Sequence, residues 1–382
     1  MRVDLSALPV VDGHCHPLRP DPWTLSPREF LDLFSEGRPG SMAPHIPSTL
    51  YYRRALRELA EGLECEETPE AILDRRKMLG AAEATRRLSA SRVGALLVDT
   101  GYPSGAMPLA EMRRLLPCAV HEVFRIESCA EALLPKALPY GEFLDAFRQE
   151  VSAASSGSVA FKSIIAYRSG LAVREWPAPN AEAAYRAAVA RVRAGGTARL
   201  TEKPLLDSLC LLALTVATET GLPFQVHAGI GDPDIELPQA NPLFLQPILE
   251  DGRWDAARIV ILHLAYPYLR EAAFMAAVWP QVFVDLSLAL PLLGAGAALP
   301  LVEVLSLAPA SKLMYGSDLG ALPEFYALSA DWARATLGEA LGWLVERDQC
   351  RAEDARVVGG QILADNARRL YALPIAFDQE TR

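Results

Sequence analysis

The sequence predicts an α/β fold, a single (β/α)8 TIM barrel with a helical insertion after strand one and helices at the C-terminus. Eight short apolar runs recur along the 382 residues, and a helical stretch follows each of them. Histidines and other polar side chains gather where several of these runs end, as they do at the mouth of a barrel. The length also fits two or three domains. Because no repeat or linker divides the chain, we expect one domain over residues 1–382.

The eight runs have the near-continuous apolar character of parallel strands that helices bury on both faces. In chain order the expected strands are VVDGHCH (10–16), VGALLVDTGY (93–102), AVHEVFRIES (119–128), VAFKSIIAYR (159–168), PFQVHAG (223–229), IVILHLAY (259–266), VFVDLSL (282–288) and LMYGSD (313–318).

Residues 20–92 are predicted to form a helical insertion, because they are too many for a simple loop between strands one and two. Ser26 and Glu29 match a capping box, and Ser48 and Thr68 are expected to begin two further helices. An insertion that follows a barrel strand at its carboxyl end should lie over the barrel mouth. It is expected to serve as a lid or as an oligomer contact.

Two helices are expected between strands four and five. Asn180 and Thr201 are the predicted N-terminal caps, and Gly195 and Gly221 are the predicted stops.

The charge balance argues against a nucleic-acid partner. The chain has 37 Lys and Arg against 47 Asp and Glu, a net charge of −10, and no basic run. The apolar stretch Leu286–Val302 is interrupted by Pro291 and Gly294, so it is expected to be a buried strand and loop rather than a membrane span. The six cysteines form no CxxC pair, and the N-terminus lacks the apolar core of a signal peptide. We therefore expect a cytoplasmic protein without a membrane partner.

Four of the six histidines lie at the carboxyl ends of expected strands: His14, His16, His227 and His263. Residues two apart share a strand face, so His14 and His16 should point together into the mouth while Cys15 points away. A lone strand histidine is usually a core residue that has found a partner. Four imidazoles at one end of a barrel favour a shared metal ion, which removes the cost of burying them unpaired.

Lys162 and Asp318 end strands four and eight in the same way. A lysine among apolar neighbours must pair, lose its proton or be modified. Asp318 is expected either to cap the following helix or to act as metal ligand and proton shuttle.

Candidate substrate contacts also follow from strand spacing. Arg125 and Glu127 are predicted to share a face of strand three, and Arg168 to share the face of Lys162 on strand four. An arginine at the mouth suits a substrate carboxylate. Alternatively, Arg125 and Glu127 form structural ion pairs with neighbouring groups. Further candidate contacts are Tyr102, at the end of strand two, and the loop residues Asp232 and Asp234.

These residues, HCH at 14–16 with Lys162, His227, His263 and Asp318, resemble the amidohydrolase superfamily of metal-dependent hydrolases. Five further segments are similar to an amidohydrolase-related branch of this superfamily. They are FKSIIAYRSGL, PFQVHAGIGDPD with the NPL that comes after it, ILHLAYPY, VFVDLSLALP and YGSD. That branch is also found fused to glutamine synthetase in nodulin-like plant and fungal proteins. The closing DNARRLYAL is similar to the last helix of many members. The resemblance spans nearly the whole chain and is strongest over residues 158–326.

The resemblance implies that His14 and His16 bind a divalent metal, most often zinc. His227 and His263 would bind a second metal, or complete and flank a single site. Lys162 stands where two-metal members carry a carbamylated lysine that bridges both ions. His263 and Asp318 would be catalytic, with Asp318 as general acid and base. We expect two metals per chain with carbamylated Lys162 as the bridge, and one metal is the alternative.

The expected function is hydrolysis of an amide or other C–N bond in a small, carboxylate-bearing substrate by a metal-activated water. The glutamine synthetase link suggests, by analogy, a γ-glutamyl or similar amino-acid amide. One alternative is a decarboxylase of the same superfamily, and another is a non-catalytic binding or signalling barrel. A homo-oligomer is compatible with all three.

Overall fold

The computed structural model describes residues 2–374, and at its centre eight parallel strands follow one another in sequence order. Every strand expected from the sequence is present, so the (β/α)8 architecture is confirmed. The strands are shorter than expected at their carboxyl ends, because several of the polar residues there belong to loops. They are β1 (Val10–Cys15), β2 (Val93–Asp99), β3 (Ala119–Arg125), β4 (Ser158–Ser163), β5 (Phe224–Val226), β6 (Ile259–Ile261), β7 (Val282–Asp285) and β8 (Leu313–Met314).

Backbone hydrogen bonds between β1 and the segment after β8 join the two ends of the sheet. The Gly13 amide donates to the Tyr315 carbonyl at 3.0 Å, and the amides of Ser317 and Asp318 donate to the His14 carbonyl at 3.1 and 2.8 Å. A Cβ on Gly13 would stand 2.9 Å from the Tyr315 carbonyl oxygen, closer than side chains pack. Glycine at this position therefore lets the two segments approach.

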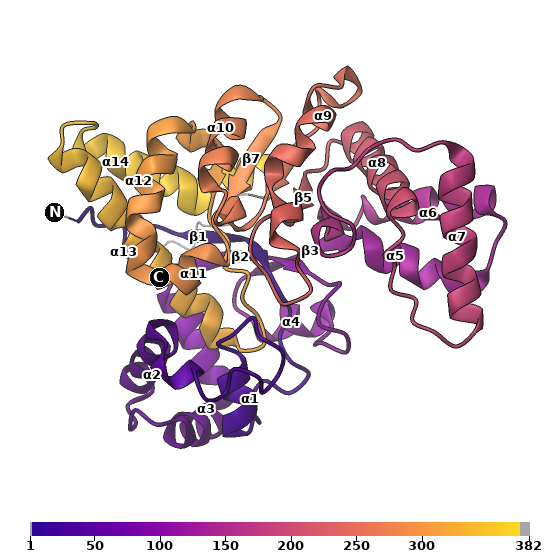
Figure 1. Ribbon diagram of the computed structural model, residues 1–382. Coiled ribbons are helices and arrows are strands. Elements are labelled where there is room, and N and C mark those ends of the chain that lie inside the picture. Colours follow the sequence, from indigo (N-terminus) through magenta and orange to yellow (C-terminus); the bar gives the residue numbers. More distant parts are fainter. Residues whose placement is uncertain (1, 375–382) are drawn as a thin grey trace.

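Helices surround the strands on two sides (Figure 1). One group, α5 to α8, lies at one end of the view, and α10, α12, α13 and α14 lie at the other. The helices outside the insertion are α4 (Leu109–Leu115), α5 (Ile126–Leu133), α6 (Tyr140–Ala154), α7 (Ala178–Arg193), α8 (Lys203–Thr220), α9 (Gln246–Leu249), α10 (Leu269–Val278), α11 (Ala289–Leu293), α12 (Ala298–Leu307), α13 (Pro323–Glu346), α14 (Ala352–Gly360) and α15 (Asn366–Leu370).

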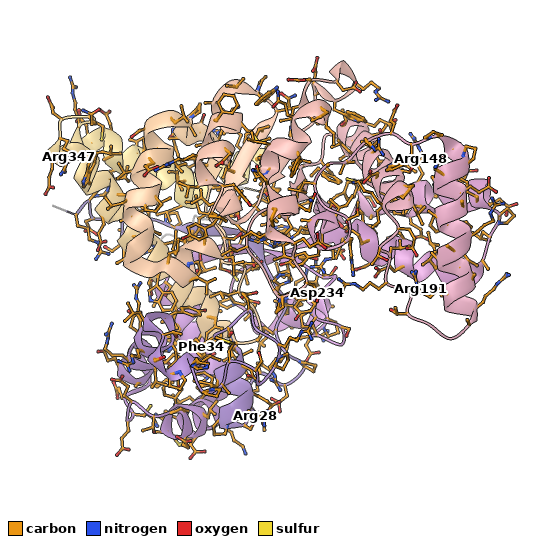
Figure 2. The ribbon with its side chains drawn as sticks, in the orientation of Figure 1. Arg28, Phe34, Arg148, Arg191, Asp234 and Arg347 are labelled. Atoms are coloured by element: carbon orange, nitrogen blue, oxygen red, sulfur yellow. The ribbon has the colours of Figure 1, made fainter. Side chains whose placement is uncertain are left out.

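The insertion is helical, as expected, and contains α1 (Pro27–Asp32), α2 (Leu50–Leu63) and α3 (Pro69–Ala90). Figure 2 shows Phe34 within this helical group. The Phe34 ring packs edge-to-face on Phe325 of α13, with ring centroids 5.4 Å apart. Together with other apolar residues of the insertion and of α13, including Trp332, these rings form one hydrophobic cluster. The insertion is thus attached to the barrel through α13, while its role as lid or oligomer contact stays a prediction.

Two of the three predicted helix starts in the insertion are confirmed. Ser26 and Glu29 form the capping box of α1, and the Thr68 side chain caps α3. The start predicted at Ser48 is one residue early, because Ser48 ends a short 3-10 turn and the Thr49 side chain caps α2.

The caps predicted for the two helices between β4 and β5 are wrong. Asn180 lies inside α7, which begins at Ala178, and Thr201 precedes the N-cap residue of α8, Glu202. Each helix carries a proline in its first turn, where the fixed φ of proline suits a helix start and sets the boundary. The predicted stop at Gly221 is confirmed, with a left-handed φ of 70°.

The apolar stretch Leu286–Val302 is not the buried strand and loop that its prolines and glycines suggested. Strand β7 ends at Asp285, and α11 and α12 occupy most of the chain from there to Leu307. The segment Ala289–Leu307 is long and apolar enough to cross a membrane, with mean hydropathy 1.8 and 33% of it buried. A single segment of this kind is weak evidence for a membrane span. Gly294, with φ 53° and ψ −131°, interrupts its helical course.

A buried ion pair connects the insertion to α13. Arg76 of α3 donates from Nε and Nη2 to the two carboxylate oxygens of Glu324, at 2.8 and 2.9 Å, and Nη2 also donates to the Pro22 carbonyl. Neither side chain of the pair is more than 2% exposed.

We predict that Arg76→Ala lowers the free energy of unfolding by about 3–5 kcal/mol, because it leaves the Glu324 carboxylate buried without its partner. Urea denaturation measures this loss. Arg86→Ala is the control, since Arg86 pairs with Glu83 at the surface and its removal should change stability little. Equal stability of the two variants would contradict the prediction.

Candidate metal centre and active site

His14, His16 and Asp318 come together at the barrel mouth. His14 lies on β1, His16 is one residue beyond it, and Asp318 follows β8. Asp318 Oδ1 stands 2.9 Å from His14 Nε2 and 3.2 Å from His16 Nε2. One potential ligand atom from each residue lies within 4.8 Å of the other two. The predicted pairing of the two histidines is therefore present. Cys15 points away and donates to the Leu97 carbonyl.

This cluster fits a divalent cation. Asp318 Oδ1 is buried and close to two imidazole nitrogens, yet it makes no hydrogen bond to any described residue. Polar atoms that converge without bonding to one another are expected where they share an ion. Two imidazoles and one carboxylate are also a donor set that zinc and similar metals bind. The three residues therefore fit the metal that the resemblance implies.

The side chain of His16 is oriented by a backbone carbonyl. His16 Nδ1 lies 3.2 Å from the carbonyl oxygen of Tyr102. Because a carbonyl oxygen can only accept a hydrogen bond, His16 Nδ1 carries the hydrogen. His16 Nε2 then offers a lone pair on the side of Asp318. Tyr102 lies three residues beyond the end of β2, with its ring edge-to-face on His16 and 58% exposed. Its exposed ring remains a candidate substrate contact.

Lys162 reaches the same centre from β4. Its Nζ lies 2.9 Å from His14 Nε2 and 3.8 Å from Asp99 Oδ2, and the side chain is only 2% exposed. Burial lowers the pKa of Lys162 to about 8, although the charge of Asp99 opposes this shift. Burial, with the charge of Lys162, lowers the pKa of His14 to about 4, so this imidazole is neutral and able to bind metal. A lysine with a lowered pKa supplies the neutral amine that carbamylation requires, and that modification stays a prediction.

Asp99, at the end of β2, is a site residue that the sequence reasoning missed. Arg125 holds it from Nε and Nη2, with the Nη2 to Oδ2 distance at 2.5 Å. Burial alone would raise the pKa of Asp99, but the charges of Arg125 and Lys162 hold it well below its ordinary value. Its position at the end of an apolar run was the signal that could have found it. Of the two alternatives for Arg125, the structural ion pair matches the contacts.

The prediction that Glu127 shares a strand face with Arg125 is wrong. Strand β3 ends at Arg125, and the chain turns directly into α5, which contains Glu127. The alternation of a strand therefore does not apply to this pair. Glu127 Oε1 accepts hydrogen bonds from the Ser163 hydroxyl at 2.6 Å and from the Ile164 amide at 3.0 Å. Glu127 thus supports the end of β4.

Arg168 does not lie on the strand face of Lys162 either. Strand β4 ends at Ser163, and a short 3-10 turn, η3 (Ile165–Tyr167), rotates the chain before Arg168. Arg168 Nη2 lies 3.3 Å from Glu131 Oε1. Its Nε and Nη1 have no hydrogen-bond partner among the described residues, although the side chain is only 9% exposed. Two unpaired buried donors are suited to an anionic group.

His227 and His263 lie beside the cluster as a hydrogen-bonded pair. His263 Nε2 is 2.8 Å from His227 Nδ1, and His263 Nδ1 is 2.9 Å from the Ser287 hydroxyl and 3.8 Å from Asp318 Oδ2. Burial lowers the pKa of both histidines well below the ordinary value, which favours neutral rings. The Tyr167 ring packs on His227, with centroids 4.3 Å apart. Sequence reasoning missed Ser287 and Tyr167, which carry no motif of their own.

Glu36 is an acidic residue of the insertion whose pKa is raised. Surrounding protein, followed by the charges of Asp318 and Asp232, raises the pKa of this carboxyl, although the residue is itself exposed at the surface. Glu36 belongs to the loop between α1 and α2. The position of the insertion over the barrel mouth stays a prediction.

Comparisons with known proteins agree with this geometry. A family model described as amidohydrolase matches residues 165–373. Protein fluG of Emericella nidulans is 28% identical over 96% of this chain, which corresponds to 46% of fluG. The chain thus spans about half the length of this curated relative.

Two solved structures are similar over nearly the whole chain. A Lactobacillus casei protein proposed to be a metal-dependent hydrolase is 27% identical, with a TM-score of 0.88 over 97% of this chain and 98% of its own. A Thermotoga maritima uronate isomerase is 16% identical, with a TM-score of 0.67 over 96% and 95% of the two chains. The second likeness concerns the fold alone.

We predict that His14→Ala removes bound metal and turnover while the barrel stays folded, because one of two imidazoles on the ion is lost. Elemental analysis of the purified variant measures metal content, and circular dichroism checks the fold. His45→Ala is the matched control, since His45 is exposed and lies outside the cluster. Unchanged metal content in His14→Ala would sink the assignment of this residue as a ligand.

We predict that Lys162→Ala lowers both turnover and metal content, and that formate or acetate partly restores them by replacing the carbamate. Intact-protein mass spectrometry under CO2 should show the carbamate as an added mass on the native chain. An unmodified Lys162 in an active protein, with no rescue of the variant, would leave this lysine as a substrate contact.

Proposed function

This chain belongs to the amidohydrolase family, and from that premise we propose that it hydrolyses an amide or other C–N bond of a small, carboxylate-bearing substrate with a metal-activated water. The observation that carries the proposal is the position of Asp318. Its carboxylate lies beside the two imidazoles of His14 and His16 and within 3.8 Å of His263. One carboxylate at this point can contact the metal and also move a proton.

His14, His16 and Asp318 would hold a divalent metal, which when bound would supply a water of lowered pKa and polarise a substrate carbonyl. A divalent cation bound beside the Asp318 carboxylate would favour its ionised form. Asp318 then accepts the proton of the attacking water and returns it to the leaving nitrogen. His16, held by the Tyr102 carbonyl, keeps its Nε2 directed at the same point.

Arg168 is the candidate that best supports a carboxylate on the substrate. Arg125 is engaged with Asp99 and the Gly101 carbonyl, whereas Nε and Nη1 of Arg168 lack partners among the described residues. A substrate carboxylate could accept from both nitrogens in the paired geometry that arginine favours.

We propose that the metal is zinc and that carbamylated Lys162 is an anionic group at the ion. We also propose that the enzyme is cytoplasmic. The proposal includes no nucleic-acid or membrane partner, and it allows a homo-oligomer. The resemblance leaves one or two metals open.

The direct test is product analysis with zinc-loaded protein. γ-Glutamyl and other amino-acid amides should release the amine or ammonia, and carboxylated ring compounds should release no CO2. Release of CO2 would favour the decarboxylase instead. A metal-stripped protein that neither binds added zinc nor turns over any of these compounds would favour the binding barrel.

We predict that Asp318→Asn folds normally and loses about 10²–10⁴-fold in turnover, the range expected for removal of a general acid and base. Steady-state kinetics on an amide that the native enzyme cleaves measure this loss, with metal content determined on the same sample. Turnover near the native value would contradict the role of Asp318 as general acid and base. The alternative that Asp318 caps the following helix is wrong, because the N-cap residue of α13 is Leu322.

A further inference from the structure

We propose that Asp285 and Ser287, at the end of β7, are positioning residues that fix the tautomers of His263 and His227. The chain of contacts runs from Asp285 through Ser287 and His263 to His227, whose buried Nε2 is left with a free lone pair. This inference rests on the proposed function for its catalytic meaning. The contacts themselves stand independently of the reaction.

The direction of the hydrogen bonds is set at Asp285. Its Oδ1 accepts from the backbone amide of Ser287 at 2.9 Å and lies 3.4 Å from the amide of His263, which also donates to it. Amide groups only donate, so Oδ1 is an acceptor whatever the protonation of the other oxygen. The Ser287 hydroxyl also contacts this oxygen. The Ser287 hydroxyl therefore donates its single hydrogen to Asp285 Oδ1.

The state of Ser287 decides the tautomer of His263. Having donated its hydrogen, the hydroxyl can only accept, and the atom within reach is His263 Nδ1 at 2.9 Å. The next neighbour of Nδ1 is the Asp318 carboxylate at 3.8 Å, which is also an acceptor. Both neighbours require a hydrogen on Nδ1. In a neutral ring, Nε2 of His263 then carries a lone pair.

That lone pair in turn decides the tautomer of His227. His263 Nε2 is 2.8 Å from His227 Nδ1, which must donate the hydrogen between them. His227 Nε2 is left unprotonated, and it is buried with no hydrogen-bond partner among the described residues. A free lone pair at this place can bind a cation or accept a proton from water.

The same chain of contacts excludes His263 from metal binding. Its Nδ1 holds a hydrogen, and its Nε2 lone pair accepts from His227, so the ring has no free lone pair. Of the two arrangements that the resemblance implies, this favours a single ion at His14, His16 and Asp318. His227 then completes or flanks that ion, and His263 positions His227.

The backbone around these residues is built for close approach. His263, Leu264 and Ala265 all have positive φ, at 62°, 55° and 46°, a conformation that costs free energy in residues other than glycine. A Cβ on Gly316 would collide with Asp285 Oδ2 and stand 3.0 Å from Ser287 Cβ. A Cβ on Gly229 would collide with the backbone of Ala265. The fold accepts strain and two glycines to hold this arrangement.

The tautomers can be read by NMR of protein labelled with 15N-histidine, before and after addition of zinc to metal-stripped protein. We expect Nδ1–H tautomers for both His227 and His263, with signals assigned from His227→Gln and His263→Gln variants. On zinc binding, His263 should keep its tautomer, and elemental analysis should find one metal per chain. A protonated Nε2 on His263, or coordination of His263 to zinc, would overturn the proposal.

Ser287→Ala removes the hydroxyl that fixes the tautomer of His263, so His227 should show a mixture of tautomers. Turnover should fall about 10- to 100-fold, as for other groups that orient ligands. Ser287→Thr keeps the hydroxyl and should restore both readouts. Ser329→Ala is the matched control, because Ser329 is also buried and hydrogen-bonded, to Tyr315, away from the chain of contacts. Native tautomers in Ser287→Ala would overturn the proposal. Because the NMR readout needs no substrate, failure of the proposed function would be seen separately.

Discussion

The carbonyl oxygen of His14 accepts hydrogen bonds from the backbone amides of Ser317 and Asp318. The rest of the site depends on this pair of hydrogen bonds. It joins the first strand to the segment after the last one. Residues of the first strand and of the segment after the last strand therefore become neighbours, and the Asp318 carboxylate lies beside two imidazoles. Asp318 adopts a left-handed φ of 61°, which turns its side chain at the point where the barrel meets itself. Glycine at position 13 makes the close approach possible.

Burial of polar groups is the second constraint, because an unpaired charge in the barrel is costly. Two networks satisfy it. Arg125 pairs with Asp99, whose carboxylate faces the amine of Lys162, in one network. Asp285 and Ser287 lead to His263 in the other. Both networks end at the metal centre. Within residues 2–374, the polar groups left there without a protein partner have the chemistry of metal ligands and of substrate contacts.

Helix α13 connects the insertion to the same centre. Its Glu324 holds Arg76 of α3, and its Tyr326 hydroxyl donates to the carbonyl of His16 at 2.5 Å. One helix therefore contacts the candidate metal ligand His16 and also contributes to the buried ion pair that connects it to the insertion.

The sequence by itself determined the eight strands, the helical insertion, and the meeting of His14, His16, Lys162 and Asp318. Hydrophobic runs and residues at strand ends are local patterns, and the barrel brings strand ends to one rim. Only the tertiary structure decided where Glu127 and Arg168 lie, because their strands end earlier than the apolar runs. It also decided the roles of Asp99 and Ser287. Their partners are distant in sequence or set by hydrogen-bond direction, which no spacing encodes.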